Sequence, residues 1–384
     1  MNSLQTMLID AVPELSPFIP AWRALAEDAP MSSPEWLLAW WEVYAKPKDR
    51  LSLLLFHKSE GSLVGLAPLF LEDAEGKATY RILGVADDVT HHATWLAAPG
   101  WEDRIGKEVA RYLLGCESSW KRLLFEAVDD EAEAVYATVR HLADNGLLHH
   151  RRQINSCWRI DLPSTWDEYL QTLSKSLRKR CRKLQRQFFD SGIMTLRQAE
   201  TEAELNEGFE ILLKLHSARW GSAEKPLGAF DDDKFHRFHQ KVARTMLTRN
   251  QLRLAWLEYG DKPVAIEYQF FDDNTVYAYQ AGVDLSVNDE CSPGKLTMMA
   301  AIRFAIEHGC KWFDLLRGND PYKANWRAVP RPCHDLRVWS RRSPGRMEWF
   351  LWNGYTMAVR YLKPVLPEKL VHRTLLLLRG MKKS

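Results

Sequence analysis

The sequence lacks the features that mark metal-binding, secreted and membrane-spanning chains. Its six cysteines are scattered, with no C-x-x-C pair and no Cys/His spacing typical of a metal site, so we expect reduced thiols and no bound metal. The first residues carry neither a basic segment nor a long apolar run, which predicts that there is no signal peptide. No run approaches about 18 apolar residues, so we expect no membrane-spanning helix. These absences together favour a cytoplasmic protein.

The chain also has little excess charge of either sign. Its formal net charge is +2 at pH 7, so a case for nucleic-acid binding must rest on local patches. With 384 residues, 46% of them hydrophobic and 27% charged, the chain has ample core material for a globular protein. The length predicts two domains or one large domain.

Apolar periodicity predicts two successive sets of helices and strands in a similar order. We expect the first set to comprise helices at 17–29 and 35–45, strands at 51–57, 63–71, 80–85 and 94–97, a helix at 101–115, a strand at 122–128, a helix at 131–145 and a strand at 157–162. The second set comprises a helical stretch at 165–190 with a break near Ser174, a strand at 193–198, helices at 202–220 and 231–249, strands at 252–258, 264–271 and 275–281, a helix at 293–308, and strands at 312–316 and 338–340.

This order of elements is typical of a mixed α/β (α+β) fold, and its repetition predicts an internal duplication. We therefore expect an N-terminal domain at 1–155 and a C-terminal domain at 156–342 that carries the active site. Residues 343–384 read as a helical appendix interrupted at Pro364 and Pro367. Its basic flanks suit contact with a membrane surface, although a helix packed back on the second domain is the favoured interpretation of the pattern.

The stretch at 292–326 is the strongest candidate for a functional site. Ser292 and Pro293 are suited to the N-cap and first position of a helix, and such a helix start attracts anions because its first N–H groups are unpaired. Gly294 lets a ligand approach the backbone closely, and Lys295 adds positive charge. The alternative is a well-capped helix that simply leads into the strand at 312–316.

The segment at 174–188 is the most charged part of the chain and contains no acidic residue. On a helix its apolar residues share one stripe, and the cations Lys175, Arg178, Lys179, Arg182, Lys183 and Arg186 lie opposite, with Arg180 near the border. Because like charges repel along such a face, the pattern predicts an anionic partner at 174–186: a polyphosphate-bearing ligand, an anionic polymer or RNA. The alternative is a face that only meets water.

The chain resembles GNAT-superfamily proteins of the CelD/BcsL type, acetyltransferase-like proteins linked to cellulose and other polysaccharide production. The resemblance covers nearly the whole chain. It rests on SSPEWLLAWW (32–41), LVGLAPLF (63–70), YRILG (80–84), SKSLRKRCRKLQR (174–186), LKLHSARW (213–220), KPVAIEYQF (262–270), GVDLSVNDECSPGKL (282–296) and FDLLRGNDPYKANW (313–326). It is also similar to FemABX peptidyl transferases, which carry a tandem GNAT duplication and a comparable basic helix.

The resemblance implies a tandem GNAT-like fold of mixed central sheets flanked by helices, with acetyl-CoA or another acyl-CoA as co-substrate. In such folds the acyl-CoA lies where two central strands separate, and its pyrophosphate meets a helix start. The residues of this chain that match that helix start are Ser292, Gly294, Lys295 and Leu296.

The reaction implied is attack of an amine or hydroxyl on an acyl thioester, which needs a base, a donor for the oxyanion and an acid for the thiolate. Glu267, amid apolar neighbours on a strand, is one candidate base, and His216 on the helix at 202–220 is the other. The alternatives are a solvated, outward-facing Glu267 and a histidine that only packs in its helix. Tyr322 could protonate the thiolate, and Lys323 could hold a phosphate or the oxyanion.

Further candidates concern binding. Arg178 and Arg182 on the basic segment, and Arg317 at a strand end, are candidate substrate-binding residues; alternatively Arg317 pairs with Asp314 or Asp320. The pair His91-His92 is not expected to share a metal, because adjacent side chains on a strand point to opposite faces.

The function that we predict is acyl transfer to an amine or hydroxyl of a small or sugar- or polysaccharide-linked acceptor. One alternative is a FemABX-like aminoacyl transferase, the one case in which a nucleic acid, tRNA, would be a partner. The other is a non-catalytic factor in polysaccharide biosynthesis. The sequence does not distinguish the acceptor, the acyl group or the oligomeric state.

Overall fold

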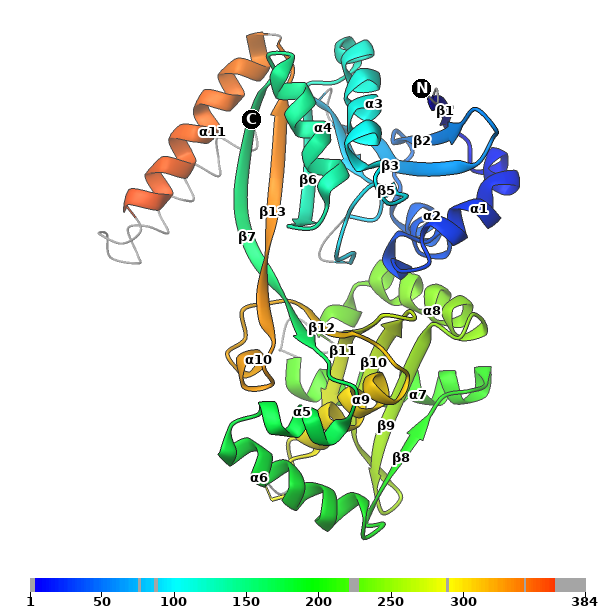
Figure 1. Ribbon diagram of the computed structural model, residues 1–384, viewed down its shortest axis with the longest axis vertical. Helices are drawn as coiled ribbons and strands as arrows, with labels where there is room; N and C mark the ends of the chain where they lie inside the picture. Colours follow the sequence, from blue (N-terminus) through cyan, green and yellow to red (C-terminus); the bar gives the residue numbers. More distant parts are fainter. Residues whose placement is uncertain are drawn as a thin grey trace.

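The structure is a computed structural model that describes residues 4–74, 77–85, 89–220, 228–287, 290–341 and 343–362. Its first part comprises β1 (Leu4–Ile9), η1 (Val12–Phe18), α1 (Ile19–Leu25), η2 (Pro30–Ser32), α2 (Pro34–Tyr44), β2 (Arg50–Lys58), β3 (Leu63–Ala74), β4 (Lys77–Ile82), β5 (Leu96–Ala97), α3 (Glu102–Gly115), η3 (Glu117–Ser119), β6 (Arg122–Asp129), α4 (Glu133–Asp144) and β7 (Leu148–Asp161). Figure 1 shows these elements in the upper part of the molecule, from which β7 runs down into the lower part.

The second part continues through the lower half of Figure 1 and returns at its end to the upper half. It comprises α5 (Trp166–Thr172), α6 (Lys175–Leu184), η4 (Gln185–Phe189), β8 (Met194–Gln198), α7 (Glu202–Trp220), η5 (Gly228–Asp231), α8 (Asp233–Thr248), β9 (Leu252–Tyr259), β10 (Lys262–Phe271), β11 (Thr275–Val283), α9 (Pro293–Glu307), β12 (Trp312–Arg317), α10 (Tyr322–Asn325), β13 (Val329–Trp339) and α11 (Ser343–Leu362).

Side-chain caps explain where several helices begin. The Ser33 hydroxyl accepts a hydrogen bond from the Trp36 N–H at the start of α2. Thr165 and Glu168 form a capping box at the start of α5. Ser174 caps α6 through the Leu177 N–H, which confirms the predicted break in the helical stretch at 165–190.

The described strands form one continuous mixed sheet, in which two sets of strands pair in the same way. In the first set β1, β2, β3 and β4 pair antiparallel in sequence, and β4 pairs parallel with β6. In the second set β8, β9, β10 and β11 pair antiparallel in sequence, and β11 pairs parallel with β12. The predicted mixed α/β fold is confirmed, with one shared sheet where separate central sheets were expected.

Each set is completed by the last strand of the other set. β7 pairs antiparallel with β12, and β13 pairs antiparallel with β6. The same two strands also pair with each other, from Val329 opposite Arg159 to Trp339 opposite Leu148. Figure 1 shows the resulting long two-stranded ribbon running between the upper and lower parts. The ribbon therefore makes each set of strands depend on the other.

The sequence prediction found only part of this ribbon. A strand at 338–340 was expected, whereas β13 begins at Val329 and contains Pro330 and Pro332. Proline lacks the N–H that a ladder uses, so prolines argue against an interior strand. The structure accommodates them beside an irregularity, where the register with β7 shifts between Pro332 and His334. The strand β1 was also missed.

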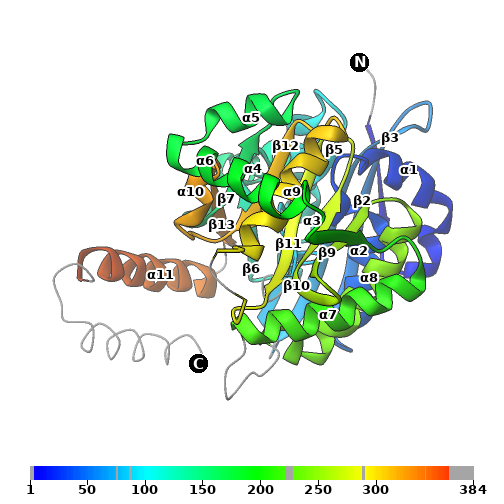
Figure 2. The same cartoon turned by 90° about the horizontal axis from the view of Figure 1, so that it is seen from below.

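The predicted domain boundary at 155/156 falls inside β7, and the division into two domains stays a prediction. A shared core also joins the two sets of elements. On α2, Trp36 packs edge-on against Phe238 of α8 and Phe270 of β10, with ring centroids 5.1 Å apart in both pairs. Figure 2 shows α2 and α8 on the same side of the sheet. Both parts of the chain thus bury their apolar faces together.

The predicted helical appendix begins as α11, and residues 363–384, with both interrupting prolines, lie outside the described residues. No helix within the described residues is long and apolar enough to cross a bilayer.

The close crossing of α3 and α4 is one packing feature whose energetic cost can be tested. A Cβ added at Gly106 of α3 would lie 2.5 Å from the Ala137 Cβ and 2.8 Å from the Ala134 carbonyl oxygen. Gly106→Ala should therefore lower the free energy of unfolding by about 1–3 kcal/mol, measured by urea unfolding. Gly115→Ala in the same helix meets nothing within 4 Å and should be neutral or slightly stabilising. Equal effects of the two substitutions would contradict the packing described.

Candidate functional site

The basic segment forms α6 with the two faces that the sequence predicts. Cys181 and Leu184 are buried, as is Phe188 in the following η4. The cations Lys175, Lys179, Arg182, Lys183 and Arg186 are exposed. Arg178 is half-buried and donates to the Gln171 Oε1 at 2.6 Å. Since its apolar stripe is docked, α6 presents its charge outward on a fixed surface.

Arg180 connects α6 to the start of α9. Its guanidinium donates to the Glu290 carbonyl oxygen at 2.8 Å and to the Ser292 hydroxyl at 2.9 Å. Ser292 precedes α9 as predicted, but its φ is +44° and its side chain makes no capping hydrogen bond. The predicted N-cap position is therefore confirmed, whereas the Ser292 hydroxyl accepts from Arg180 and does not cap the helix.

The remaining residues of this helix start fall into two groups. The N–H groups of Lys295 and Leu296 both donate to the Ser292 carbonyl oxygen, at 2.8 and 3.2 Å. Leu296 is fully buried, so it supports the core. The Gly294 N–H makes no hydrogen bond within the described residues, and Lys295 is exposed. Gly294 and Lys295 are thus the two residues of this start that can meet an anion.

Lys295 also lies close to α6. Burial raises the pKa of the Cys181 thiol to about 11, while the positive charge of Lys295 acts to lower it. The exposed face of α6 and the start of α9 consequently form one positively charged surface, which we call the α6–α9 surface.

The parallel strands β11 and β12 separate after a short contact. They pair only from Thr275 to Tyr277 and from Trp312 to Asp314. Beyond Tyr277, β11 continues to Val283 with β10 on its other side, where Glu267 pairs with Ala281. Glu267 therefore lies one strand away from the opening between β11 and β12.

Glu267 is turned into the protein, with 6% of its surface exposed, which rules out the solvated alternative. It shares one face of β10 with Gln269, whose Oε1 accepts from the buried Arg253 at 2.7 Å. Burial lowers the pKa of Arg253 to about 10, and the nearby Glu267 carboxylate opposes that shift. Glu267 and Arg253 thus lie close to each other in the interior of the protein.

The other candidate base lies on the opposite face of the sheet. His216 is buried on α7, and its ring packs against Phe230 at 5.3 Å. Its backbone nitrogen approaches Gly282 of β11 so closely that an added Cβ would lie 2.7 Å away. The structure therefore does not bring His216 and Glu267 together as one pair.

Tyr322 and Lys323, although adjacent, point into different surroundings. Tyr322 is 41% exposed at the start of α10. The Lys323 amine is buried and donates to the carbonyl oxygens of Leu315, Leu316 and Arg317, at 3.0, 3.2 and 3.0 Å. Leu316 has a φ of +54°, so the ammonium fixes an unusual turn of the backbone at the end of β12. Burial lowers the pKa of Lys323.

The alternative considered for Arg317 was an ion pair with Asp314 or Asp320. Among the described residues Arg317 makes neither pair. Its Nε donates to the His91 Nδ1 at 2.9 Å, and its Nη2 donates to the Thr90 carbonyl oxygen at 3.3 Å. Burial and the charge of Arg317 hold the pKa of His91 well below its usual value, so His91 is neutral. Arg317 thus ties β12 to the loop that precedes β5.

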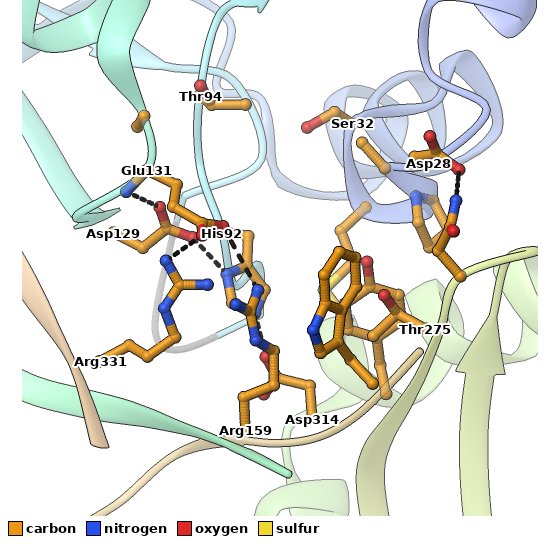
Figure 3. Close-up of a pocket in the computed structure, with 17 residues that line it drawn as sticks. Asp28, Ser32, His92, Thr94, Asp129, Glu131, Arg159, Thr275, Asp314 and Arg331 are labelled. Atoms are coloured by element: carbon orange, nitrogen blue, oxygen red, sulfur yellow. Dashed lines mark hydrogen bonds and ion pairs between the residues drawn. The ribbon is translucent and has the colours of Figure 1, made fainter. Parts of the chain in front are cut away.

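A polar pocket between the two parts of the molecule was not predicted from the sequence. It has a volume of 240 Å³. Its lining comes from η2, the end of β6, the starts of β11 and β13, and the strands β7 and β12. Figure 3 shows Asp129, Glu131, Arg159, Asp314 and Arg331 gathered around His92, with Asp28 and Ser32 on the opposite side. Tyr277 and Asp314, the last paired residues of β11 and β12, both line it. The pocket therefore borders the opening between those strands.

His92 lies between two carboxylates in this pocket. Its Nδ1 is 2.6 Å from Asp129 Oδ2 on β6, and its Nε2 is 3.2 Å from Asp314 Oδ2 on β12. Burial disfavours the charged ring, but Asp314 and Asp129 outweigh it and raise the pKa of His92 well above 6.5. The same contact lowers the pKa of Asp129 to about 2. His92 is thus a cation that connects the two sets of strands.

The other ionic groups of the pocket also hold defined partners. The Arg159 guanidinium lies over the Trp312 ring at 4.6 Å and is 3.3 Å from the Glu131 Oε2. Arg331 pairs with Glu131 and lies 3.1 Å from the Asp130 Oδ1. No group of three His, Cys, Asp or Glu side chains arranged to hold a metal occurs within the described residues.

Little in the sequence signals this pocket. The pair His91-His92 draws attention, but the carboxylates that hold His92 come from strands far along the chain. Only the pairing of β6, β13, β7 and β12 brings them together.

Comparison with known proteins supports the class of fold. Residues 175–324 match the family model of the acetyltransferase (GNAT) domain, which covers less than half of the chain. The matched segment begins at α6 and ends in α10, and it contains both the α6–α9 surface and the opening between β11 and β12. No curated protein sequence matches the chain.

Among solved structures, the chain is similar to FemX, with a TM-score of 0.62 at 10% sequence identity over 88% of this chain and 98% of that one. It is also similar to a conserved protein of unknown function from Bacteroides thetaiotaomicron, with a TM-score of 0.51 at 10% identity over 87% of this chain and 100% of that one. At such identities the likeness concerns the fold alone.

The ionic contacts of His92 predict a pH-dependent stability. His92→Asn leaves Asp129 and Asp314 without their shared cation, so we expect the free energy of unfolding to fall by about 3 kcal/mol at pH 6, as for a broken buried ion pair. Because the folded pKa of His92 is raised, this contribution is complete below about pH 6.5 and is lost as the pH rises through the raised pKa. It also declines from about pH 3.8 to 2, as Asp129 becomes protonated.

Urea unfolding of both proteins across this pH range measures the contribution, with His149→Asn as the matched control, because His149 is exposed. A difference between wild type and His92→Asn that grows above pH 6.5 would contradict the assignment.

Proposed function

We propose that the protein transfers an acyl group from acetyl-CoA or another acyl-CoA to an amine or hydroxyl of a small or sugar-linked acceptor. The observation that carries this proposal is the α6–α9 surface, which places fixed positive charge and the Gly294 N–H beside the opening between β11 and β12. The GNAT domain match over the same residues supports it. The proposed site of action is the cytoplasm.

The donor would bind with its phosphates on the α6–α9 surface. Gly294 offers an N–H at the positive end of α9, and Lys295 and the exposed cations of α6 offer charge. Arg182 belongs to this set, whereas Arg178 is held by Gln171. The acyl end would then lie between β11 and β12, where Glu267 is close.

The acceptor would bind in the pocket between the two parts. The pocket carries four carboxylates (Asp28, Asp129, Glu131 and Asp314) against three cations (His92, Arg159 and Arg331). This balance favours an acceptor that is itself positively charged or rich in hydroxyl groups, such as an amine or an amino sugar. Since Tyr277 and Asp314 border both spaces, donor and acceptor would meet beside them.

Two groups remain candidates for proton transfer. Glu267 is the proposed base, because it is buried and lies one strand from the opening. Tyr322 is the proposed acid for the thiolate, because it is exposed near the end of β12. His216 is a less favoured base from the other face. Lys323 is proposed as a positioning residue, because its amine holds the end of β12 through three carbonyl groups.

A second candidate function is FemABX-like aminoacyl transfer. The similarity in fold to FemX and the exposed charge of α6 favour it, since that face could meet the phosphates of tRNA. A third candidate function, suggested by the resemblance to CelD/BcsL-type proteins, is that of a non-catalytic factor in polysaccharide production. Binding of acyl-CoA distinguishes the first candidate from both others.

Calorimetric titration with acetyl-CoA and with free CoA tests the donor. We expect micromolar binding that weakens at least about tenfold in Gly294→Glu and in Lys295→Glu, because each places a carboxylate beside the phosphates. Lys214→Glu on α7 makes the same charge change as Lys295→Glu on the other face of the sheet and should bind normally. An absence of binding by wild type, or an equal loss in all three variants, would overturn the acyl-CoA proposal.

Steady-state kinetics of CoA release, with a panel of amines, amino sugars and hydroxylated sugars, tests the rest of the site. Arg159→Ala should raise the KM for the acceptor about tenfold and leave the affinity for acetyl-CoA unchanged. The reason is that Arg159 lines the pocket and is not part of the α6–α9 surface. Glu267→Gln should instead lower kcat about a hundredfold with little change in KM, because it removes the base. The proposed division of roles is wrong if the two variants show the same pattern.

A further inference from the structure

Among the described residues, the helix α11 packs on the ribbon of β7 and β13 through the side that carries Trp349 and Trp352. The Trp352 ring lies over the guanidinium of Arg337 at 3.6 Å, and the Trp349 Nε1 donates to the His149 carbonyl oxygen at 3.1 Å. Figure 1 shows α11 running outward beside the ribbon, and Figure 2 shows it projecting from the body of the molecule.

The opposite side of α11 carries a stripe of exposed apolar side chains. Met347, Phe350, Leu351 and Met357 are 63%, 67%, 54% and 62% exposed. Their spacing places them on one face of the helix, turned away from Trp349 and Trp352.

This exposure is concentrated. Within the described residues, six large apolar side chains are more than half exposed, and four of them form this stripe. Single exposed apolar residues are ordinary, whereas a contiguous stripe marks an interaction surface.

The charge of the neighbouring sequence indicates the kind of partner. Arg346, beside the stripe, is exposed. The segment at 363–384 follows α11 directly and contains one acidic residue, Glu368, against six basic residues: Lys363, Lys369, Arg373, Arg379, Lys382 and Lys383. Apolar side chains next to a cluster of cations are the combination that binds an anionic lipid surface.

A second copy of the chain fits the stripe less well. The stripe extends over 11 residues, about 16 Å of helix, and its four side chains bury at most about 600 Å². A stable dimer needs about 800 Å² from each partner. A bilayer has no such minimum, because the apolar and electrostatic contributions simply add.

We propose that α11 docks the protein on the surface of an anionic bilayer, and that the basic residues that follow it in the sequence add electrostatic attraction. The helix lies on the membrane without crossing it, with Met347, Phe350, Leu351 and Met357 in contact with the lipid. The surface lies apart from the α6–α9 surface and from the pocket, so this inference does not rest on the proposed acyl transfer.

Flotation of the full chain with lipid vesicles tests the docking surface. We expect binding to phosphatidylcholine vesicles that contain phosphatidylglycerol, weaker binding to pure phosphatidylcholine, and release by salt. The double substitution Phe350→Glu and Leu351→Glu should reduce the bound fraction about tenfold. The matched control is Leu285→Glu with Val329→Glu, which makes the same charge change at two equally exposed apolar residues elsewhere. The control should bind as wild type does.

Three outcomes would overturn the proposal: no flotation of wild type with anionic vesicles, equal loss in both double variants, or equal binding to neutral and anionic vesicles. Light scattering provides a further check, because a wild-type dimer that only the α11 variant dissociates would assign the stripe to a second copy. All four substituted residues are exposed, and circular dichroism melting confirms that each variant is folded.

Discussion

The antiparallel pairing of β7 with β13 is the constraint on which the rest of the structure depends. Each strand leaves the set of elements that precedes it and completes the sheet of the other set, β7 beside β12 and β13 beside β6. Neither set can therefore satisfy the backbone hydrogen bonds of its last parallel strand alone. The shared core around Trp36 and Phe238 adds apolar burial to the same connection.

The position of the pocket follows from this exchange. Because β6, β13, β7 and β12 are neighbours in one sheet, a carboxylate at the end of β6 and one within β12 come within reach of a single histidine. His92 then contacts one carboxylate from each set of strands, and both Asp129 and Asp314 stabilise its charged form. A change in the relative position of the two parts would alter the shape of the pocket. It would also alter the opening between β11 and β12, which the pocket borders. Binding of an acceptor and the joining of the two parts are thus physically coupled.

Much of the fold could be predicted from the sequence because its signals are local. The periodicity of α6, the cap at Ser174, the hairpins β2–β3 and β9–β10 and the strand–helix order are set by near neighbours. The exchange of β7 and β13 could not be predicted, because no local pattern states which strand pairs with which, and Pro330 and Pro332 argue against a strand. The basic face at 174–186 and the helix start at Ser292 were each expected from the sequence, but their contact was not, since Arg180 and Ser292 are 112 residues apart. The contacts of His92 were missed for the same reason, because Asp129 and Asp314 are also far from it in the sequence.

The exchanged strand has a consequence for synthesis of the chain on the ribosome. β6 ends at Asp129, but the strand that covers its open edge ends at Trp339. At typical elongation rates the intervening residues take about 10–40 s to emerge, and during that time the edge of β6 is available to any other extended chain. The nascent protein would therefore need a chaperone, or a temporary pairing of β7 with β6, until its own last strand arrives.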